Sequence, residues 1–116
     1  MPGDLQVQEE PIGGAHLIAA TGEVDHGTSR VLADALRRAT VAGDGNVVLD
    51  LTETWFIDSA GISTLLNGLR RLTRQRRKLI VVCPPGSPRR VFELLGLVGT
   101  FDLVDSRRDA LADGSG

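Results

Sequence analysis

The sequence predicts a single α/β domain. Strand-like and helix-like segments alternate along the chain, and a helix between two strands allows them to lie parallel through a right-handed crossover. The 116 residues suit one compact domain, and a hydrophobic content of 41% is enough to form a buried core. The sequence contains no internal repeat, so we expect one sheet and one core.

Five segments have the pattern of β-strands. Residues 46–51 and 78–83 are short, nearly all apolar runs, as expected for strands that are covered on both faces. Residues 5–8 alternate apolar and polar side chains, which predicts a strand at an edge of the sheet. The other two segments are residues 16–22, which end at a glycine, and the short stretch 101–104. We therefore expect the two apolar strands inside the sheet.

Three segments space their apolar residues by three and four, as an amphipathic helix does. The first covers residues 28–42, and the second begins at Ser59. The third follows the proline-rich loop 84–88, and Gly96 stands where a C-terminal glycine cap belongs. The apolar residues expected to line this third helix are Val91, Leu94 and Leu95.

The composition argues against a membrane protein and a secreted protein. The longest apolar runs are far shorter than the roughly 20 residues that cross a bilayer. The first ten residues lack the basic region and apolar core of a secretion signal. The single cysteine, Cys83, lies within an apolar run, which suits a core thiol in a reducing compartment. We expect a cytoplasmic protein that makes no contact with a membrane.

Charged residues are segregated along the chain. Residues 1–58 carry ten acids and three arginines, whereas residues 59–92 carry no acid and eight basic residues. Such a block is most often a solvated helix face, although it can also guide a partner. An isoelectric point near 5.6 and few aromatic residues do not indicate a nucleic-acid-binding module. The eight basic residues are Arg70, Arg71, Arg74, Arg76, Arg77, Lys78, Arg89 and Arg90.

Ser59 stands at the start of the second helix, directly after a predicted strand, where α/β sheets usually carry their sites. The helical period places it on a polar stripe, so its hydroxyl should face solvent. The other members of this stripe are Ser63, Asn67, Arg70 and Arg74. The Ser59 hydroxyl can cap the helix, which contributes about 1 kcal/mol. It can equally carry a phosphate, which the positive helix terminus favours. The spacing leaves both roles open.

The neighbours of Ser59 bear on a possible modification. A phosphate adds about −1.5 to −2 charges at neutral pH, and the adjacent Asp58 would oppose that charge. Gly61, two residues further on, is expected to leave the backbone uncovered for a partner or a kinase. Phosphorylation is therefore expected to change the surface and leave the fold intact.

The sequence indicates no catalytic or metal site. His16 and His26 stand outside any cluster of cysteines and carboxylates, so no metal-binding spacing is present. The stretch "DSAG" differs from the G-x-S-x-G elbow of serine hydrolases, and the G-x-x-x-x-G-K-[ST] phosphate-binding loop is missing. A hydrolase would also need a base and an oxyanion hole beside the serine. We expect a protein that is not an enzyme and holds no metal or cofactor.

Four short motifs occur in order along the chain: "GEVD" at 22–25, "VVLDL" at 47–51, "FIDSAGI" at 56–62 and "PRRVFELLGL" at 88–97, which is followed by "FDLV". Together they resemble the STAS domain of bacterial anti-sigma factor antagonists. The resemblance covers residues 5–112 and leaves 1–4 and 113–116 as expected flexible termini. It implies a mixed sheet of about five strands, with helices packed mainly on one face.

The resemblance also implies a regulatory role. Similar stand-alone proteins bind an anti-sigma factor that is also a serine kinase, and this binding frees a sigma factor. The kinase then phosphorylates the serine at the start of the second helix, and the antagonist dissociates. A serine phosphatase restores the unphosphorylated antagonist. In this chain that serine is Ser59, Asp58 and Gly61 match the flanking motif, and Asp25 matches an acidic residue before the first helix. With Ile62, these residues form the expected partner surface.

Two features depart from the family pattern. Residues 74–78, "RQRRK", replace a turn that often contains glycine, and the basic block 70–78 could act as a specificity patch. Trp55 occupies a variable position, and we expect it to be partly buried. An alternative within the family is a scaffold or accessory subunit of a transport or signalling complex without a phospho-switch. The intact "DSAG" and the full-length match favour the regulator.

Overall fold

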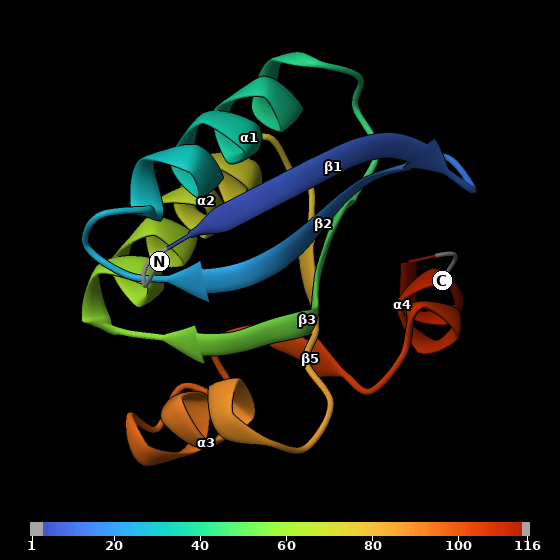
Figure 1. Ribbon diagram of the computed structural model, residues 1–116. Helices are drawn as coiled ribbons and strands as arrows, with labels where there is room; N and C mark the ends of the chain where they lie inside the picture. Colours follow the sequence, from blue (N-terminus) through green and yellow to red (C-terminus); the bar gives the residue numbers. More distant parts are fainter. Residues whose placement is uncertain (1–3, 115–116) are drawn as a thin grey trace.

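The structure, a computed structural model, describes residues 4–114 and contains one five-stranded sheet with four helices (Figure 1). The strands are β1 (Leu5–Ile12), β2 (Ala15–Val24), β3 (Val47–Ile57), β4 (Leu79–Val82) and β5 (Asp102–Val104). The helices are α1 (Ser29–Val41), α2 (Ser59–Arg74), α3 (Ser87–Leu94) and α4 (Arg107–Gly114). The termini predicted to be flexible, 1–4 and 113–116, lie mainly outside the described residues.

The strands follow the order β1-β2-β3-β4-β5 across the sheet. Strand β1 is antiparallel to β2, and each of the other neighbouring pairs is parallel. The sheet is therefore mixed, as predicted, and each parallel pair is joined through a helix.

The helices divide unequally between the two faces of the sheet. The larger core cluster joins the sheet to α1, α2 and α3, whereas a smaller cluster contains Ala110 of α4 (Figure 1). Alternation along β4 explains the division, because Leu79 and Val81 belong to the larger cluster while Ile80 and Val82 belong to the smaller. This confirms the prediction of helices mainly on one face. None of the helices in residues 4–114 has the length and apolar character needed to span a bilayer.

Strand β3 runs well beyond the predicted strand at 46–51. Its first part pairs with both β2 and β4, and its last part pairs with β2 alone, where Glu23 lies opposite Phe56 and Val24 opposite Ile57. Two register irregularities interrupt the pairing of β2 with β3. Because of these irregularities, polar and apolar residues do not alternate regularly in this part of the sequence, and the pattern did not predict a strand there. The extension places Trp55 and Phe56 at the end of the sheet where α2 begins.

Helix α3 faces the core through Phe92, whose ring meets that of Phe101 edge-on at a centroid distance of 5.5 Å. Val91 is half-buried, but Leu94 and Leu95 are exposed. The prediction that these two leucines line the core is therefore wrong. At about 100° per residue, Leu94 points about 200° away from Phe92, so one face cannot bury both of them. Leu95 is the C-cap residue, after the last residue of α3.

The end of α3 has the predicted glycine cap. Gly96 has a φ of 69°, the left-handed conformation that glycine adopts without a Cβ clash. Its N–H donates to the Glu93 carbonyl, and the Leu97 N–H donates to the Phe92 carbonyl at 2.9 Å. This pair of bonds is a Schellman motif, which ends the helix and reverses the chain.

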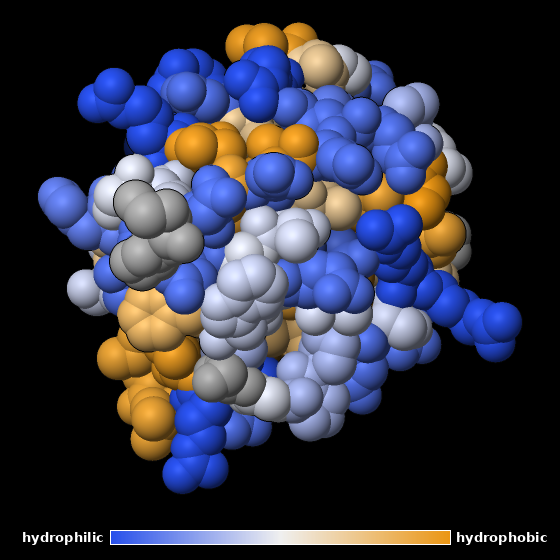
Figure 2. All heavy atoms as spheres, viewed as in Figure 1, coloured by the Kyte–Doolittle hydropathy of each residue, from blue (hydrophilic) through white to orange (hydrophobic). Residues whose placement is uncertain are grey.

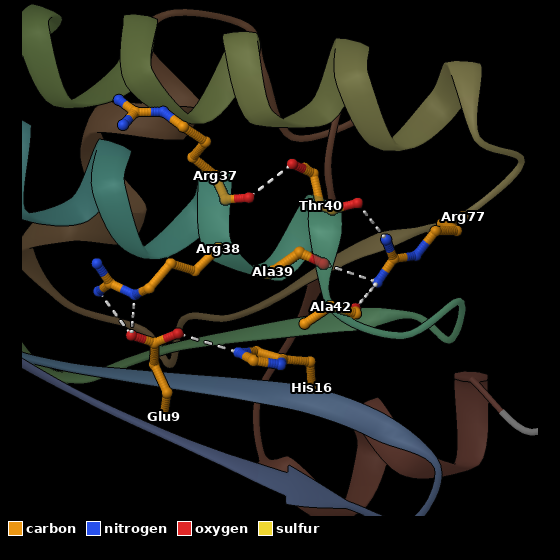
Figure 3. A network of polar contacts seen from close by, with 8 residues as sticks. All are labelled: Glu9, His16, Arg37, Arg38, Ala39, Thr40, Ala42 and Arg77. Carbon is orange, nitrogen blue, oxygen red and sulfur yellow. Dashed lines mark hydrogen bonds and ion pairs between the residues drawn. The ribbon is translucent and has the colours of Figure 1, made fainter.

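Arg77, counted within the basic block, is buried at the C-terminal end of α1. Its guanidinium also donates to the Gln75 side chain at 2.7 Å. Unpaired helix carbonyls and the negative end of the helix dipole both favour a cation here. Arg77 therefore caps α1, and the surface block loses one member. Its backbone acceptors, three of them drawn in Figure 3, are the carbonyls of Ala39 (3.0 Å), Thr40 (3.3 Å), Ala42 (3.4 Å) and Gly45 (2.6 Å).

The "RQRRK" turn adopts the geometry of a glycine turn without a glycine. Arg76 has a φ of 59°, in the left-handed region. Its N–H donates to the Thr73 carbonyl, and the Arg77 N–H donates to the Leu72 carbonyl, so α2 also ends in a Schellman motif. The departure from the family pattern thus preserves the turn and places an arginine where glycine is favoured.

A second polar contact in Figure 3 ties α1 to the edge strand β1. Arg38 Nε donates to Glu9 Oε2 at 2.8 Å, and His16 Nε2 lies 3.2 Å from Glu9 Oε1. Burial alone would raise the pKa of Glu9, but the contacts with Arg38 and His16 outweigh it and lower that pKa below its usual value. The contacts with Arg38 and His16 thus favour the charged form of Glu9.

Candidate functional site

Asp58, and not Ser59, caps helix α2. Asp58 has an extended backbone (φ −112°, ψ −171°), and its Oδ1 accepts the Ala60 N–H at 2.9 Å and the Gly61 N–H at 3.1 Å. These are two of the N–H groups that a helix start leaves unpaired. The capping role that the sequence left open for Ser59 therefore belongs to its neighbour.

Ser59 is the first residue of α2, and it is exposed. Within residues 4–114 its hydroxyl makes no hydrogen bond. The polar stripe predicted along the helix is confirmed, since Ser63, Asn67, Arg70 and Arg74 are also exposed. The hydroxyl is thus accessible to solvent at the positive end of a helix of 16 residues.

Asp25 lies in the loop between β2 and α1 and is fixed there by Thr28. The Thr28 N–H donates to Asp25 Oδ1 at 2.9 Å, and the Asp25 N–H donates to Thr28 Oγ1 at 2.9 Å. This reciprocal pair resembles a capping box. The Asp58 N–H donates to the Val24 carbonyl at 3.0 Å, so the two loops are joined next to Asp25. The structure therefore brings Asp25, Asp58 and Ser59 to the same end of the sheet.

Gly61 and Ile62, two residues of the expected partner surface, lie beneath that surface. Ile62 is buried in the larger core cluster. A Cβ on Gly61 would lie 2.7 Å from Cγ1 of Val24 and 2.7 Å from Cγ1 of Ile57. The expectation that Gly61 leaves its backbone open to a partner is corrected, because the strand ends already occupy that space. Both residues seat α2 closely against β2 and β3.

Trp55 and Phe56 are exposed at the same end of the sheet. Trp55 is 58% exposed, more than the partial burial that we expected, and its Nε1–H donates to Glu23 Oε1 at 3.2 Å. Sequence reasoning did not identify Phe56 as a surface residue. The available signal was two consecutive aromatic residues, because two neighbours on a strand cannot both point into one core.

The site is a surface and not a cavity. A cavity of about 440 Å³ lies at the opposite end of the sheet, between the turn at 13–14 and residues Ala110 and Leu111 of α4. In the described residues no three His, Cys, Asp or Glu side chains are grouped to hold a metal ion. Burial raises the pKa of the Cys83 thiol to about 11, so this cysteine is a core thiol, as predicted. The chemistry that the site offers is the exposed Ser59 hydroxyl beside the Asp58 carboxylate.

The family model and the relatives found by comparison with known proteins agree on one family. Residues 6–110 match the model of the STAS domain. An anti-sigma F factor antagonist of Paenibacillus polymyxa is 28% identical over 95% of this chain and 95% of its own length. An anti-sigma-F factor antagonist of Mycobacterium tuberculosis, RsfB, is 28% identical over 95% of this chain and 89% of its own.

Solved structures agree on the fold. The crystal structure of an anti-sigma factor antagonist from Mycobacterium paratuberculosis superimposes with a TM-score of 0.86 at 24% identity, covering 100% of this chain and 98% of that one. SpoIIAA in its unphosphorylated form gives a TM-score of 0.73 at 21% identity, covering 96% and 99%. These likenesses establish the architecture of the sheet and helices.

Proposed function

We propose that this chain, which belongs to the STAS domain family, is an anti-sigma factor antagonist switched by phosphorylation at Ser59. In its unphosphorylated form it binds a cognate anti-sigma factor that is also a serine kinase, which frees a sigma factor in the cytoplasm. Phosphorylation ends the binding, and a serine phosphatase restores it. The observation that carries this proposal is the exposed Ser59 hydroxyl, which bonds to none of the described residues and lies beside a helix cap made by Asp58.

The separation of the two residues explains how a phosphate can be added without unfolding the helix. The Ala60 and Gly61 N–H groups donate to Asp58 and not to the Ser59 hydroxyl, so adding a phosphate to that hydroxyl breaks no bond of the cap. The helix terminus stabilises an added anion. The phosphate still places about −1.5 to −2 charges beside the Asp58 carboxylate. We expect the fold to persist while the surface that a partner meets changes in charge and size.

The relatives support the partner class. Curated relatives of similar length are named anti-sigma factor antagonists. A structure of SpoIIAA in the phosphorylated form also superimposes on this chain, with a TM-score of 0.67. That protein keeps a comparable fold when phosphorylated, as the proposal requires of this one.

Phosphorylation by purified anti-sigma factors tests the proposal. Each anti-sigma factor with a kinase domain from the same genome is incubated with this chain and ATP, and the phosphate is mapped by mass spectrometry. We expect one kinase to modify Ser59, and we expect Ser59→Ala to bind that kinase and resist release. Ser63→Ala, on the same exposed stripe, is the matched control and should be modified normally. Binding without modification of Ser59 by any of these kinases would favour the scaffold alternative.

A further inference from the structure

Large apolar side chains are exposed around the end of α3. Leu94 is 72% exposed and Leu95 53%, and Val98 in the following turn is 40% exposed. Phe56 at the end of β3 is 45% exposed. Single exposed apolar residues are common, but a group of them marks an interaction surface. We call these four residues the α3–β3 patch.

The patch adjoins the Ser59 surface. Helix α3 packs against β3, and Phe56 stands two residues before Asp58 at the entry to α2. Figure 1 shows the end of α3, the end of β3 and the start of α2 on the same side of the molecule. In Figure 2 apolar surface gathers over that part of α3, at the lower left of the view. The apolar residues and the hydroxyl therefore belong to one continuous face.

Folding does not account for the patch. Phe92 and Phe101 fill the space between α3 and the sheet, and the Gly96 turn is held by backbone bonds. Leu94 and Leu95 belong to neither core cluster, so we expect polar residues at these positions to leave the core packing intact. Their apolar character thus needs a partner to explain it.

We propose that the α3–β3 patch is the apolar anchor of the same interface that Ser59 switches, and that its occupant is the anti-sigma factor. This inference rests on the proposed function. Two arguments select this occupant. The patch is continuous with the Ser59 surface, and an apolar interface explains why phosphorylation weakens binding and does not strengthen it. A phosphate at the edge of an apolar contact, next to a carboxylate, disrupts binding through desolvation and like-charge repulsion. The patch supplies the binding affinity, and the phosphorylation state of Ser59 determines whether the anti-sigma factor binds.

Binding of the purified kinase–anti-sigma factor to patch variants tests the inference. The dissociation constant is measured by calorimetry for the wild type and for the double variant Leu94→Ser with Leu95→Ser. We expect the double variant to bind about tenfold more weakly or worse. Val41→Ser is the matched control, because Val41 is 82% exposed on α1 and lies outside the patch, and its affinity should not change. Thermal unfolding confirms that each variant folds.

Two further readouts separate the outcomes. Trp55, the single tryptophan, should shift its fluorescence to shorter wavelength on binding, because it is exposed and directly precedes Phe56 of the patch. The double variant should raise the KM for phosphorylation of Ser59 and leave kcat unchanged. Wild-type affinity and KM in the double variant would overturn the anchor while leaving the phospho-switch intact. A double variant that converts a wild-type dimer to a monomer in light scattering would also overturn it, because the occupant would be a second copy.

Discussion

The two ends of the α1–α2 layer differ in how their polar groups are satisfied. At the C-terminal end, Arg77 donates to the last carbonyls of α1, and Gln75 adds a further bond to Thr40. At the N-terminal end of α2, the Ser59 hydroxyl is exposed and has no bond to residues 4–114, and aromatic residues beside it are exposed. Hydrogen bonds within the chain close the first end, whereas the second end leaves a hydroxyl exposed. Under the proposed function, the closed end serves folding and the other end serves recognition.

The largest expected effect is at the closed end. Arg77→Met leaves buried carbonyls of α1 without donors, so the free energy of unfolding should fall by about 3 kcal/mol. Urea denaturation measures the loss. Arg74→Met, an exposed member of the same basic block, should stay within about 0.5 kcal/mol of the wild type. Equal effects of the two variants would remove the distinction between a cap and a surface charge.

At the open end, Gly61→Ala tests how closely α2 is seated. The new methyl would meet Val24 and Ile57 at 2.7 Å, so we expect a loss of about 1–3 kcal/mol in unfolding free energy. Gly68→Ala is the control, because its nearest contact is the flexible end of Leu36 at 3.1 Å. There the gain in helix propensity, about 1 kcal/mol, offsets the crowding. A tolerated Gly61→Ala would contradict the tight packing beneath Ser59.

Asp58→Ala and Ser59→Ala separate the cap from the phosphate acceptor. Loss of the Asp58 carboxylate should cost about 1 kcal/mol of stability. Ser59→Ala should change stability by less than about 0.5 kcal/mol, because its hydroxyl bonds to none of the described residues. Thermal unfolding of both variants gives the comparison. A larger loss for the serine variant would return the capping role to Ser59.

The smallest expected effect is a gain at the turn after α2. Arg76→Gly relieves the left-handed backbone of an arginine and should raise the unfolding free energy by about 0.5 kcal/mol. Arg70→Gly, inside α2, should lower it by about 1 kcal/mol. Chemical denaturation of the two variants tests the sign. Destabilisation by Arg76→Gly would mean that the arginine side chain contributes more than its backbone strain.

Sequence periodicity was enough to predict the order of the five strands and of helices α1 to α3, and the polar stripe that begins at Ser59. Helix α4 was not among the three helices that it predicted. Periodicity did not reveal that Arg77 is buried, because its partners lie on α1, far away in the sequence. Nor did it give the phase of α3, where eight residues include apolar side chains on more than one face. In a helix this short, only the packing of Phe92 on Phe101 decides which side is buried.

The choice of cap was also beyond the sequence. Aspartate and serine are both good N-cap residues, and here they are adjacent. The bond from the Asp58 N–H to the Val24 carbonyl holds Asp58 in the sheet for one residue longer, so the helix begins at Ser59. A tertiary contact therefore sets the register of the cap and leaves the serine free.

The Asp58 cap has a consequence for the lifetime of the proposed switch. Since the hydrogen bonds that start α2 do not involve the serine hydroxyl, the covalent mark can be written and erased without the helix end having to reform. One molecule can then pass through many cycles of release and reuse. The speed of the response would be set by the kinase and the phosphatase, and not by synthesis or refolding of this chain.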